Sequence, residues 1–455
     1  MPEKMKTKLF ILLLICMSSL GSFARMGATG PVRAGAARVN ITPAREDLPP
    51  NFLGIHDSIF SRAIVIDNGV TGAALISVDV GFISDPAWTR ITQQIEQQLG
   101  IPARNVLLTV THTHSVPFRM GGETFEQKIF ASVKKAKDLL QPARIGYGTG
   151  VSYINVNRNI IDPVTRRWWE GPNYEGPSDK TVSVITFEAM DGSPIAVYYN
   201  YAMHAVITGQ LDMISGDVPG AASRYIEESF GNQVVALWST GAEGDQNPVY
   251  YQQTYDLREI RIKDYAERGE DISNSMPPGG TGLDRSDPVV ARLMEEQQEI
   301  ARAMGVMLGE EVKHVMRSIQ RKDAQASIAA SQKMIYFPGR RRTDRGRAGF
   351  AGSYVEGDSV QARIGVLLVN DIAIASINGE VFNPIAQQLK KESPYARTMM
   401  ATATNGMSTT GYIPNDAAFG QYTFEVLSSR LQPGYAERTI IDGLLDLMEE
   451  ANQDL

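Results

Sequence analysis

Two of the five histidines in this sequence stand two residues apart, in the run Thr-His-Thr-His-Ser at 111–115. The run follows the apolar residues 106–108, which are typical of a buried strand. Because alternate residues of a strand point to the same face, we expect His112 and His114 to point the same way. Two imidazoles on one face can share a Zn²⁺ ion, or divide into metal ligand and proton carrier. The alternative is a hydrogen-bonded structural pair.

Two more candidate ligands follow strands that we expect further along the chain. His204 comes after a predicted strand at 195–201, and a third histidine in that position is compatible with zinc. Glu380 follows a predicted hairpin at 366–377. Its carboxylate can be a metal ligand, or it can cap a helix that we expect to start near Pro384.

Two turn-rich segments add polar side chains of the kind from which sites are built. The segment 241–248 (GAEGDQNP) has glycines that permit close backbone approach, and its Asp245 and Asn247 can position a polar substrate. The pair Gly411-Tyr412 lies in a second turn-rich region, where alone it would be only a turn with an aromatic side chain.

The elements that must position these residues are helices and strands in mixed order. Two hairpins are expected, around the turn pairs Asn68-Gly69 and Asp191-Gly192. Apolar patterns predict strands at 63–66, 73–78, 182–187 and 234–237, and helices at 86–99, 125–140, 288–320 and 435–450. The fold class is therefore mixed α/β, in which helices cover mixed sheets in a single large domain.

Three further features are interpreted as peripheral. The polar, turn-rich segment 250–287 is interpreted as an insertion or a lid. The segment 339–349 carries five arginines and is expected to be an exposed basic loop. His314 lies among charged residues of the helix predicted at 288–320, so we expect it on the surface.

Residues 1–24 have the features of a secretory signal peptide. Lysines precede an apolar stretch at 9–20 that is too short to span a bilayer, and small residues end the segment at Ala24. The single cysteine, Cys16, lies inside it, so the processed chain would have neither a disulfide nor a thiolate ligand. We expect an exported protein, periplasmic or secreted, with a short tail at 25–33 before the catalytic domain at 34–455.

The charge balance restricts the partners. The formal net charge is −7, and removal of a signal peptide that carries +2 would make it −9. An acidic chain with basic residues gathered in only one loop is a poor candidate for binding nucleic acid. No second apolar run reaches transmembrane length, so only peripheral contact with a membrane stays open.

Taken together, these segments resemble the neutral (non-lysosomal) ceramidases. The similar blocks occur in the same order along most of the chain. They are 34–43, 54–57 with 61–63, 111–115 with Pro117, the Asn-x-Asn-Arg motif at 155–158, His204, 214–217 with Gly220, 379–380 and 411–412.

The resemblance implies a set of roles for these positions. One zinc ion would be bound by His112, His204, Glu380 and Tyr412. His114 would be the acid/base, and Arg158 would contact polar groups in the active site. We add His56 and Asp245 as candidate substrate-binding residues. The implied partner is a small amphiphilic N-acyl amide.

The sequence departs from the family's pattern in two places. The family has an active-site serine where this chain has Asn247. An amide cannot act as a nucleophile, which excludes a mechanism that requires that serine. Asn247 could still donate a hydrogen bond to an oxyanion. We also expect no C-terminal immunoglobulin-like domain, which makes ceramide itself a less certain substrate than amides in general.

The implied function is a secreted zinc-dependent amidohydrolase. It would cleave ceramide or a related N-acyl lipid to a fatty acid and an amine (sphingosine), by attack of zinc-activated water. One alternative is a zinc hydrolase of other N-acyl amides or peptides. Another, suggested by Asn247, is a catalytically impaired homologue that only binds. A deep apolar pocket would favour a lipid substrate, and a wide polar cleft would favour the others.

Overall fold

The computed structural model describes residues 29–117, 120–272, 283–346, 348–407 and 410–453. The predicted signal peptide at 1–24 lies outside the described residues. The last residues of the predicted tail belong to the fold, because strand β1 (Gly30–Pro31) pairs with β16 (Gln325–Ala326).

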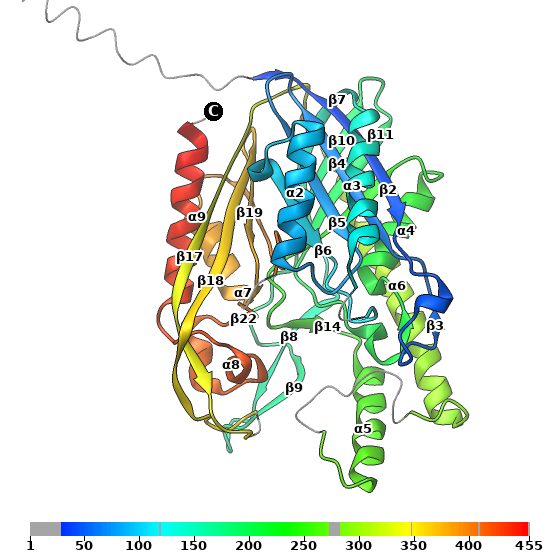
Figure 1. The fold of residues 1–455 in the computed structure, drawn as a ribbon, viewed down its shortest axis with the longest axis vertical. Helices are drawn as coiled ribbons and strands as arrows, with labels where there is room; N and C mark the ends of the chain where they lie inside the picture. The colour runs from blue at the N-terminus through cyan, green and yellow to red at the C-terminus, as the bar shows by residue number, and fades with distance from the viewer. Residues whose placement is uncertain (1–28, 118–119, 273–282, 347, 408–409, 454–455) are drawn as a thin grey trace, which may run out of the picture.

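The largest sheet has nine strands in two halves (Figure 1). One half contains β2 (Arg33–Asn40), β4 (Phe60–Asp67), β5 (Gly72–Val78) and β6 (Val106–Val110). The other contains β7 (Gln141–Val151), β10 (Thr181–Ala189), β11 (Pro194–Tyr201), β13 (Val235–Thr240) and the short β15 (Lys322–Asp323). The halves join where the start of β2 pairs with the start of β7. Both predicted hairpins, β4–β5 and β10–β11, are confirmed.

A second sheet has four strands in the order β17-β18-β19-β21. They are β17 (Ile328–Arg342), β18 (Tyr354–Val369), β19 (Ile372–Ile377) and β21 (Arg397–Ala401). The predicted turn at Asn370-Asp371 is confirmed, and Asn370 has a positive φ of 55° there. Apolar residues of this sheet and of both halves of the first sheet meet in one central core.

Helices cover the outer faces of the sheets. α2 (Asp85–Leu99) and α3 (Glu123–Asp138) cover the first half, while α4 (Asp217–Ser229) and α6 (Pro288–Ser318) cover the second. α7 (Asn383–Glu392) and α9 (Ala436–Gln453) pack on the four-stranded sheet. The helices predicted at 86–99, 125–140, 288–320 and 435–450 are therefore confirmed, with ends shifted by a few residues.

Short elements lie at one end of the sheets. They include β3 (Gly54–Ile55) with β12 (Met213–Ile214), β14 (Gln246–Pro248) with β8 (Asn155–Ile161) and β9 (Trp168–Asn173), and β20 (Glu380–Val381) with β22 (Tyr412–Ile413). The short helices are η1 (Arg45–Asp47), η2 (Ala103–Asn105), η3 (Ile207–Gln210), η4 (Asp416–Gln421) and α8 (Phe424–Ser428).

The predicted basic loop needs correction, and the interpretation of 250–287 as an insertion or a lid stays a prediction. The segment 250–287 contains the helix α5 (Gln252–Glu267), which packs against η3 and α6 through Leu257. The arginines of the predicted basic loop begin inside strand β17, and Arg340 stacks over the Tyr354 ring at 3.9 Å. This guanidinium also donates to backbone carbonyls, so Arg340 stabilises the fold. His314 is exposed on α6, as predicted.

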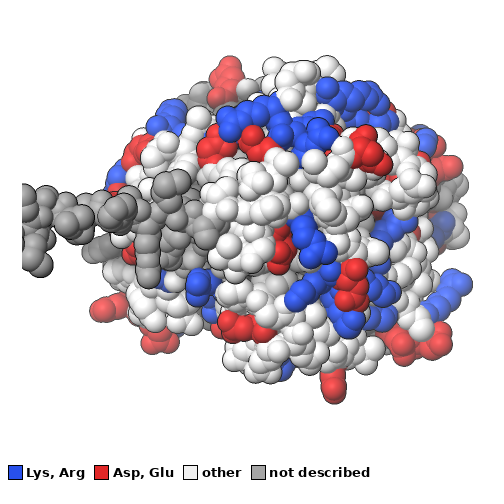
Figure 2. Space-filling model, turned by 90° about the horizontal axis from the view of Figure 1, so that it is seen from above, with Lys and Arg blue, Asp and Glu red and all other residues white. Residues whose placement is uncertain are grey.

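The surface has no strongly charged face at the end seen in Figure 2, where basic and acidic side chains intermingle. Among the described residues, no helix combines the length and the hydropathy that a membrane span needs.

A buried ion cluster ties the first half of the large sheet to α4. The Arg62 side chain on β4 is 1% exposed, and its Nε and Nη1 atoms donate to Glu227 and Asp79 at 2.9 Å each. Burial alone would lower the pKa of Arg62, but Glu227 and Asp79 raise it above its ordinary value. Asp79 lies just past β5, so the cluster also fixes the start of the loop that contains Gly81.

Arg62→Met should lower the free energy of unfolding by about 3–5 kcal/mol, because it leaves the buried Asp79 carboxylate without its ion-pair partner and Glu227 with Arg38 alone. Urea denaturation followed by circular dichroism measures the change. The matched control is Arg292→Met, which removes the arginine of the exposed Arg292–Glu296 pair on α6 and should change stability little. Equal effects in the two variants would show that burial of the cluster does not matter.

Candidate functional site

The loops that follow four strands supply the centre of the site. Gly81 follows β5, His112 follows β6, His204 follows β11 and Glu243 follows β13. The carboxyl ends of strands are where α/β folds usually build their sites. Glu380 lies on β20, which follows the second sheet's strand β19, and the parallel pairing of β20 with β22 sets Tyr412 beside it.

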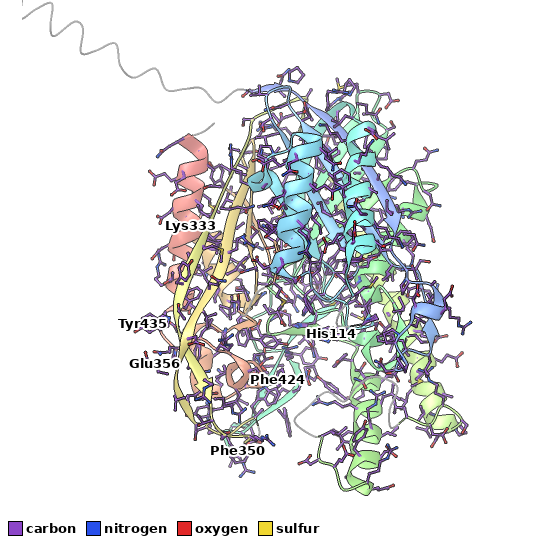
Figure 3. All side chains as sticks on the ribbon, in the orientation of Figure 1. His114, Lys333, Phe350, Glu356, Phe424 and Tyr435 are labelled. Atoms are coloured by element: carbon purple, nitrogen blue, oxygen red, sulfur yellow. The ribbon has the colours of Figure 1, made fainter. Side chains whose placement is uncertain are left out.

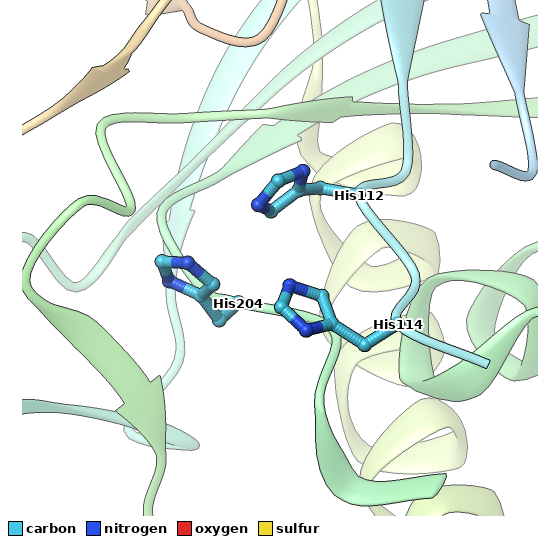
Figure 4. Close-up of side chains that lie close together, drawn as sticks. All are labelled: His112, His114 and His204. Atoms are coloured by element: carbon cyan, nitrogen blue, oxygen red, sulfur yellow. The ribbon is translucent and has the colours of Figure 1, made fainter. Parts of the chain in front are cut away.

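Figure 4 shows the rings of His112, His114 and His204 facing one another. The His112 and His114 ring centres are 5.1 Å apart, and those of His112 and His204 are 5.2 Å apart. The expectation that His112 and His114 share a site is confirmed, but the reason was wrong. Strand β6 ends at Val110, and His112 has a left-handed φ of 56°, so strand alternation does not aim these rings.

Backbone carbonyls fix two of the rings. The Nδ1 atom of His112 lies 2.7 Å from the Gly81 oxygen, and that of His204 lies 2.8 Å from the Glu243 oxygen. A carbonyl oxygen only accepts hydrogen bonds, so each Nδ1 carries a proton, and each Nε2 is the atom left to bind a metal ion or a second proton. Both Nε2 atoms face Glu380 Oε2, at 3.4 Å from His112 and 3.2 Å from His204.

This arrangement requires a positive charge between the imidazoles and the carboxylate. Burial alone would raise the pKa of Glu380, but His112 and His204 hold it well below its usual range. Burial alone would likewise lower the pKa of His112, but Glu380 raises it to about 9. A shared proton or a metal ion would meet the requirement.

The donor set fits a metal ion. The His112 Nε2 atom is buried and has no hydrogen-bond partner, as a ligand atom should be in a structure without its ion. Ligand atoms around tetrahedral zinc lie about 3.3 Å apart at the usual zinc–ligand distances, which agrees with the two Nε2–Oε2 separations. Nitrogen and carboxylate ligands without a thiolate suit zinc.

His114 faces the site differently from the other two histidines. His114 is exposed where His112 and His204 are buried, because its ring lines the cavity described below, and its backbone N–H donates to the Ala205 carbonyl at 3.0 Å. Desolvation by the surrounding protein and the imidazoles of His112 and His204 lower the pKa of His114 well below its ordinary value. All three histidines offer a nitrogen within 4.8 Å of the others, so His114 can be a ligand or a proton carrier.

Arg158 and Tyr412 form the next part of the site. The Arg158 guanidinium carbon lies 5.4 Å from the centre of the Tyr412 ring. Arg158 donates to the Gly244 carbonyl at 2.9 Å and to Glu425 at 2.5 Å. Burial, followed by the nearby Glu380 carboxylate, raises the pKa of Tyr412 well above its ordinary value. The Tyr412 phenol is therefore neutral unless a cation or donor at the site stabilises its anion.

A cavity of about 930 Å³ opens onto these groups. His112, His114, Glu380 and Tyr412 are part of its wall. The rest of the wall is largely apolar, with Phe52, Val80, Phe82, Val116, Pro117, Met120, Met213 and Met407. Polar groups occur at Asn51, Gln210, Asp212, Arg261 and Arg430.

Five predicted site residues are absent from the described wall of this cavity. His204 and Arg158 lie behind it, in contact with Glu380 and Tyr412. The other three are His56, Asp245 and Asn247. His56 is exposed, and its ring lies 3.8 Å from Asp57. Asp245 is buried, which raises its pKa to about 7, and it accepts hydrogen bonds from Asn157 and Asn383. Asn247 faces a separate cavity of about 340 Å³.

Sequence reasoning missed three groups that hold the site. The Gly81 and Glu243 carbonyls orient the two imidazoles, and Glu425 binds Arg158 from a position 267 residues away. Glu243 lies inside the glycine-rich segment that the sequence singled out. Gly81 and Glu425 carry no local signal of their role. Glu380 does not cap α7, whose N-cap is Phe382.

The His112→Ala and His204→Ala variants should each lose bound metal. Each substitution removes one of the proposed nitrogen ligands, so the remaining ligands would bind the ion more weakly. Metal content per chain, measured by plasma mass spectrometry after purification without chelators, checks this. His314→Ala, which changes an exposed histidine on α6, is the matched control and should keep its metal. Full occupancy in either site variant would remove that residue from the ligand set.

The family comparison matches residues 48–336 to the N-terminal region of the neutral/alkaline non-lysosomal ceramidases. The neutral ceramidase of Pseudomonas aeruginosa is 26% identical over 269 residues, which are 52% of this chain and 40% of that protein. Neutral ceramidase A of Dictyostelium discoideum is 29% identical over 226 residues, which are 43% of this chain and 32% of that protein. Each match thus spans less than half of the relative's own length.

Solved structures agree at the level of the fold. The crystal structure of the Pseudomonas aeruginosa neutral ceramidase aligns with a TM-score of 0.67 and 16% identity, over 92% of this chain and 75% of that one. A structure described as ceramidase complexed with C2 aligns with a TM-score of 0.68 and 15% identity, over 93% of this chain and 76% of that one. With a family match that covers more than half of its length, this chain belongs to the neutral/alkaline non-lysosomal ceramidase family.

Proposed function

We propose that this protein is an exported zinc-dependent amidohydrolase that cleaves ceramide or a related N-acyl lipid to a fatty acid and an amine. One observation carries the proposal. Two imidazole Nε2 atoms face a buried carboxylate at the wall of a large, mostly apolar cavity. The family supports amide hydrolysis, and the ligand set supports the metal. The proposed export depends only on the signal-like sequence at 1–24.

His112, His204 and Glu380 would hold the zinc ion, with Tyr412 as the fourth candidate ligand. The ion would polarise the amide carbonyl and lower the pKa of water to about 7. The protein's own groups do the rest. His114, which desolvation by the surrounding protein keeps neutral, takes a proton as general base and returns it to the leaving nitrogen. Arg158 and Tyr412 hold the acyl oxygen in place.

Asn247 supports attack by water without an acyl-enzyme intermediate. Its carboxamide is not a nucleophile. Its Oδ1 atom accepts from Arg158 at 3.3 Å, while its Nδ2 atom donates to Glu170 at 2.9 Å. One of the two N–H donors of Nδ2 is thus engaged by Glu170, and the side chain lines the separate cavity instead of the described wall of the larger one, so an oxyanion role would require it to move. Positioning of Arg158 is the role that needs no rearrangement.

The cavity supports an acyl-chain substrate over a peptide. Its volume of about 930 Å³ is within the range of pockets that enclose drug-sized ligands. Aromatic, methionine and valine side chains line much of it, which suits an alkyl chain. Its polar residues would meet a head group. Other N-acyl amides remain the alternative substrates, and a binding homologue without turnover is the alternative of another class.

The purified protein should release fatty acid and sphingosine from ceramide in equal amounts. Mass spectrometry of the products, with N-acylglycine and a peptide as comparison substrates, decides among the alternatives. If only N-acylglycine is hydrolysed, the substrate is another N-acyl amide and not ceramide. Metal-loaded protein without turnover on any of the three would favour the binding homologue.

His114→Ala should keep most of its zinc but lose roughly 10²–10⁴ in kcat, the usual contribution of a general acid/base. Metal content and steady-state rates are measured on the same sample, with His314→Ala as the control for both. If zinc is lost together with activity, His114 is a ligand.

A further inference from the structure

Three segments far apart in the sequence meet at one end of the molecule. They are the β8–β9 turn, the β17–β18 connection and the chain leading into α8. The Gly349 N–H donates to the Tyr422 carbonyl at 2.8 Å, and the Arg167 guanidinium lies 4.6 Å from the centre of the Phe350 ring. Figure 3 shows Phe350 at this lower end, with Phe424 between it and His114.

This end exposes five large apolar side chains, which we call the aromatic tip. They are Val164, 88% exposed, Trp169, 59%, Phe350, 46%, Phe424, 40%, and Tyr422, 38%. Exposed apolar side chains that gather at one place mark an interaction surface. Tryptophan and tyrosine in particular are enriched where proteins meet the membrane–water interface.

The aromatic tip is continuous with the cavity. The Phe424 ring packs edge-on against the Tyr412 ring, with 5.9 Å between the ring centres, and Tyr412 is part of the cavity wall. Arg430, two residues after α8 ends, is exposed and is also part of that wall. A lipid that leaves a bilayer at the tip would therefore meet α8 and then the cavity.

The charges beside the tip favour an anionic surface. Arg166, Arg167 and Arg345 are exposed there. Two nearby carboxylates are engaged locally, because Asp162 caps its own turn and Asp344 pairs with Arg342 at 2.7 Å, whereas Glu356 is exposed. The protein as a whole is acidic, with a net charge of −7, and the opposite end has mixed charge in Figure 2. An anionic bilayer would thus attract this end selectively.

We infer that the aromatic tip docks on an anionic lipid bilayer, with Val164, Trp169 and Phe350 at the headgroup level and the arginines on lipid phosphates. The choice of a bilayer as partner rests on the proposed lipid substrate. The docking itself requires no catalysis, so binding and hydrolysis can fail separately.

Sedimentation with vesicles tests the docking. Vesicles of phosphatidylcholine with 30 mol% (about one lipid in three) phosphatidylglycerol should retain the protein, and pure phosphatidylcholine should retain less of it. Raising the salt concentration should weaken binding, because exposed charges are screened within about 10 Å at 0.1 M. Equal or absent binding to both vesicle types would overturn the inference, whatever the enzyme hydrolyses.

Two exposed valines in hairpin turns provide a matched pair of variants. Val164→Asp at the tip should lower the partition onto anionic vesicles at least tenfold, and so should Trp169→Asp. Val70 lies in the β4–β5 turn and is 64% exposed, and Val70→Asp should leave the partition onto anionic vesicles unchanged. Light scattering of each variant monitors self-association. Identical partition of the two valine variants, or a dimer that only Val164→Asp dissociates, would overturn the inference.

Discussion

The Glu380 carboxylate lies buried between two imidazoles, and the elements around the site are arranged to keep it there. A buried carboxylate is costly unless cations and hydrogen bonds surround it. Here its partners come from segments 176 and 268 residues away in sequence. Only the assembled core, in which both sheets meet, brings them together. The site and the fold are therefore coupled, because the segment that follows the second sheet's strand β19 supplies the carboxylate and segments that follow strands of the first sheet supply the imidazoles.

The imidazoles in turn depend on carbonyls at the ends of neighbouring strands. Because Gly81 and Glu243 fix the Nδ1 protons, both Nε2 atoms point at the same carboxylate oxygen. Two residues before Gly81, Asp79 is held by Arg62, which also binds Glu227 on α4. The same chain of contacts thus runs from the histidine cluster to helix α4, which covers the sheet.

Sequence patterns were sufficient for the regular elements and insufficient for the contacts that orient the site. The β4–β5 and β10–β11 hairpins follow from alternating apolar residues and turn pairs, which are local signals. Helix α5 was missed because few of its residues are buried and one of those, Arg261, is charged. The Arg158–Glu425 pair could not be found, because nothing local in either segment identifies its partner. The ligand set itself came from resemblance to the family, and spacing alone would not have singled out Glu380 from a helix cap.

The asparagine at the family's serine position changes the surroundings of Arg158 more than it changes the ligand set. Its carboxamide contacts a cation through oxygen and a carboxylate through nitrogen, and Glu170 in turn accepts from Arg258 on α5. Arg158 is thereby connected to the helix that forms part of the cavity wall through Arg261. A substrate that moves α5 would shift Glu170 and Asn247, and with them the guanidinium beside Tyr412. If the proposed function holds, one amide side chain would link recognition at the cavity wall to the orientation of the acyl oxygen.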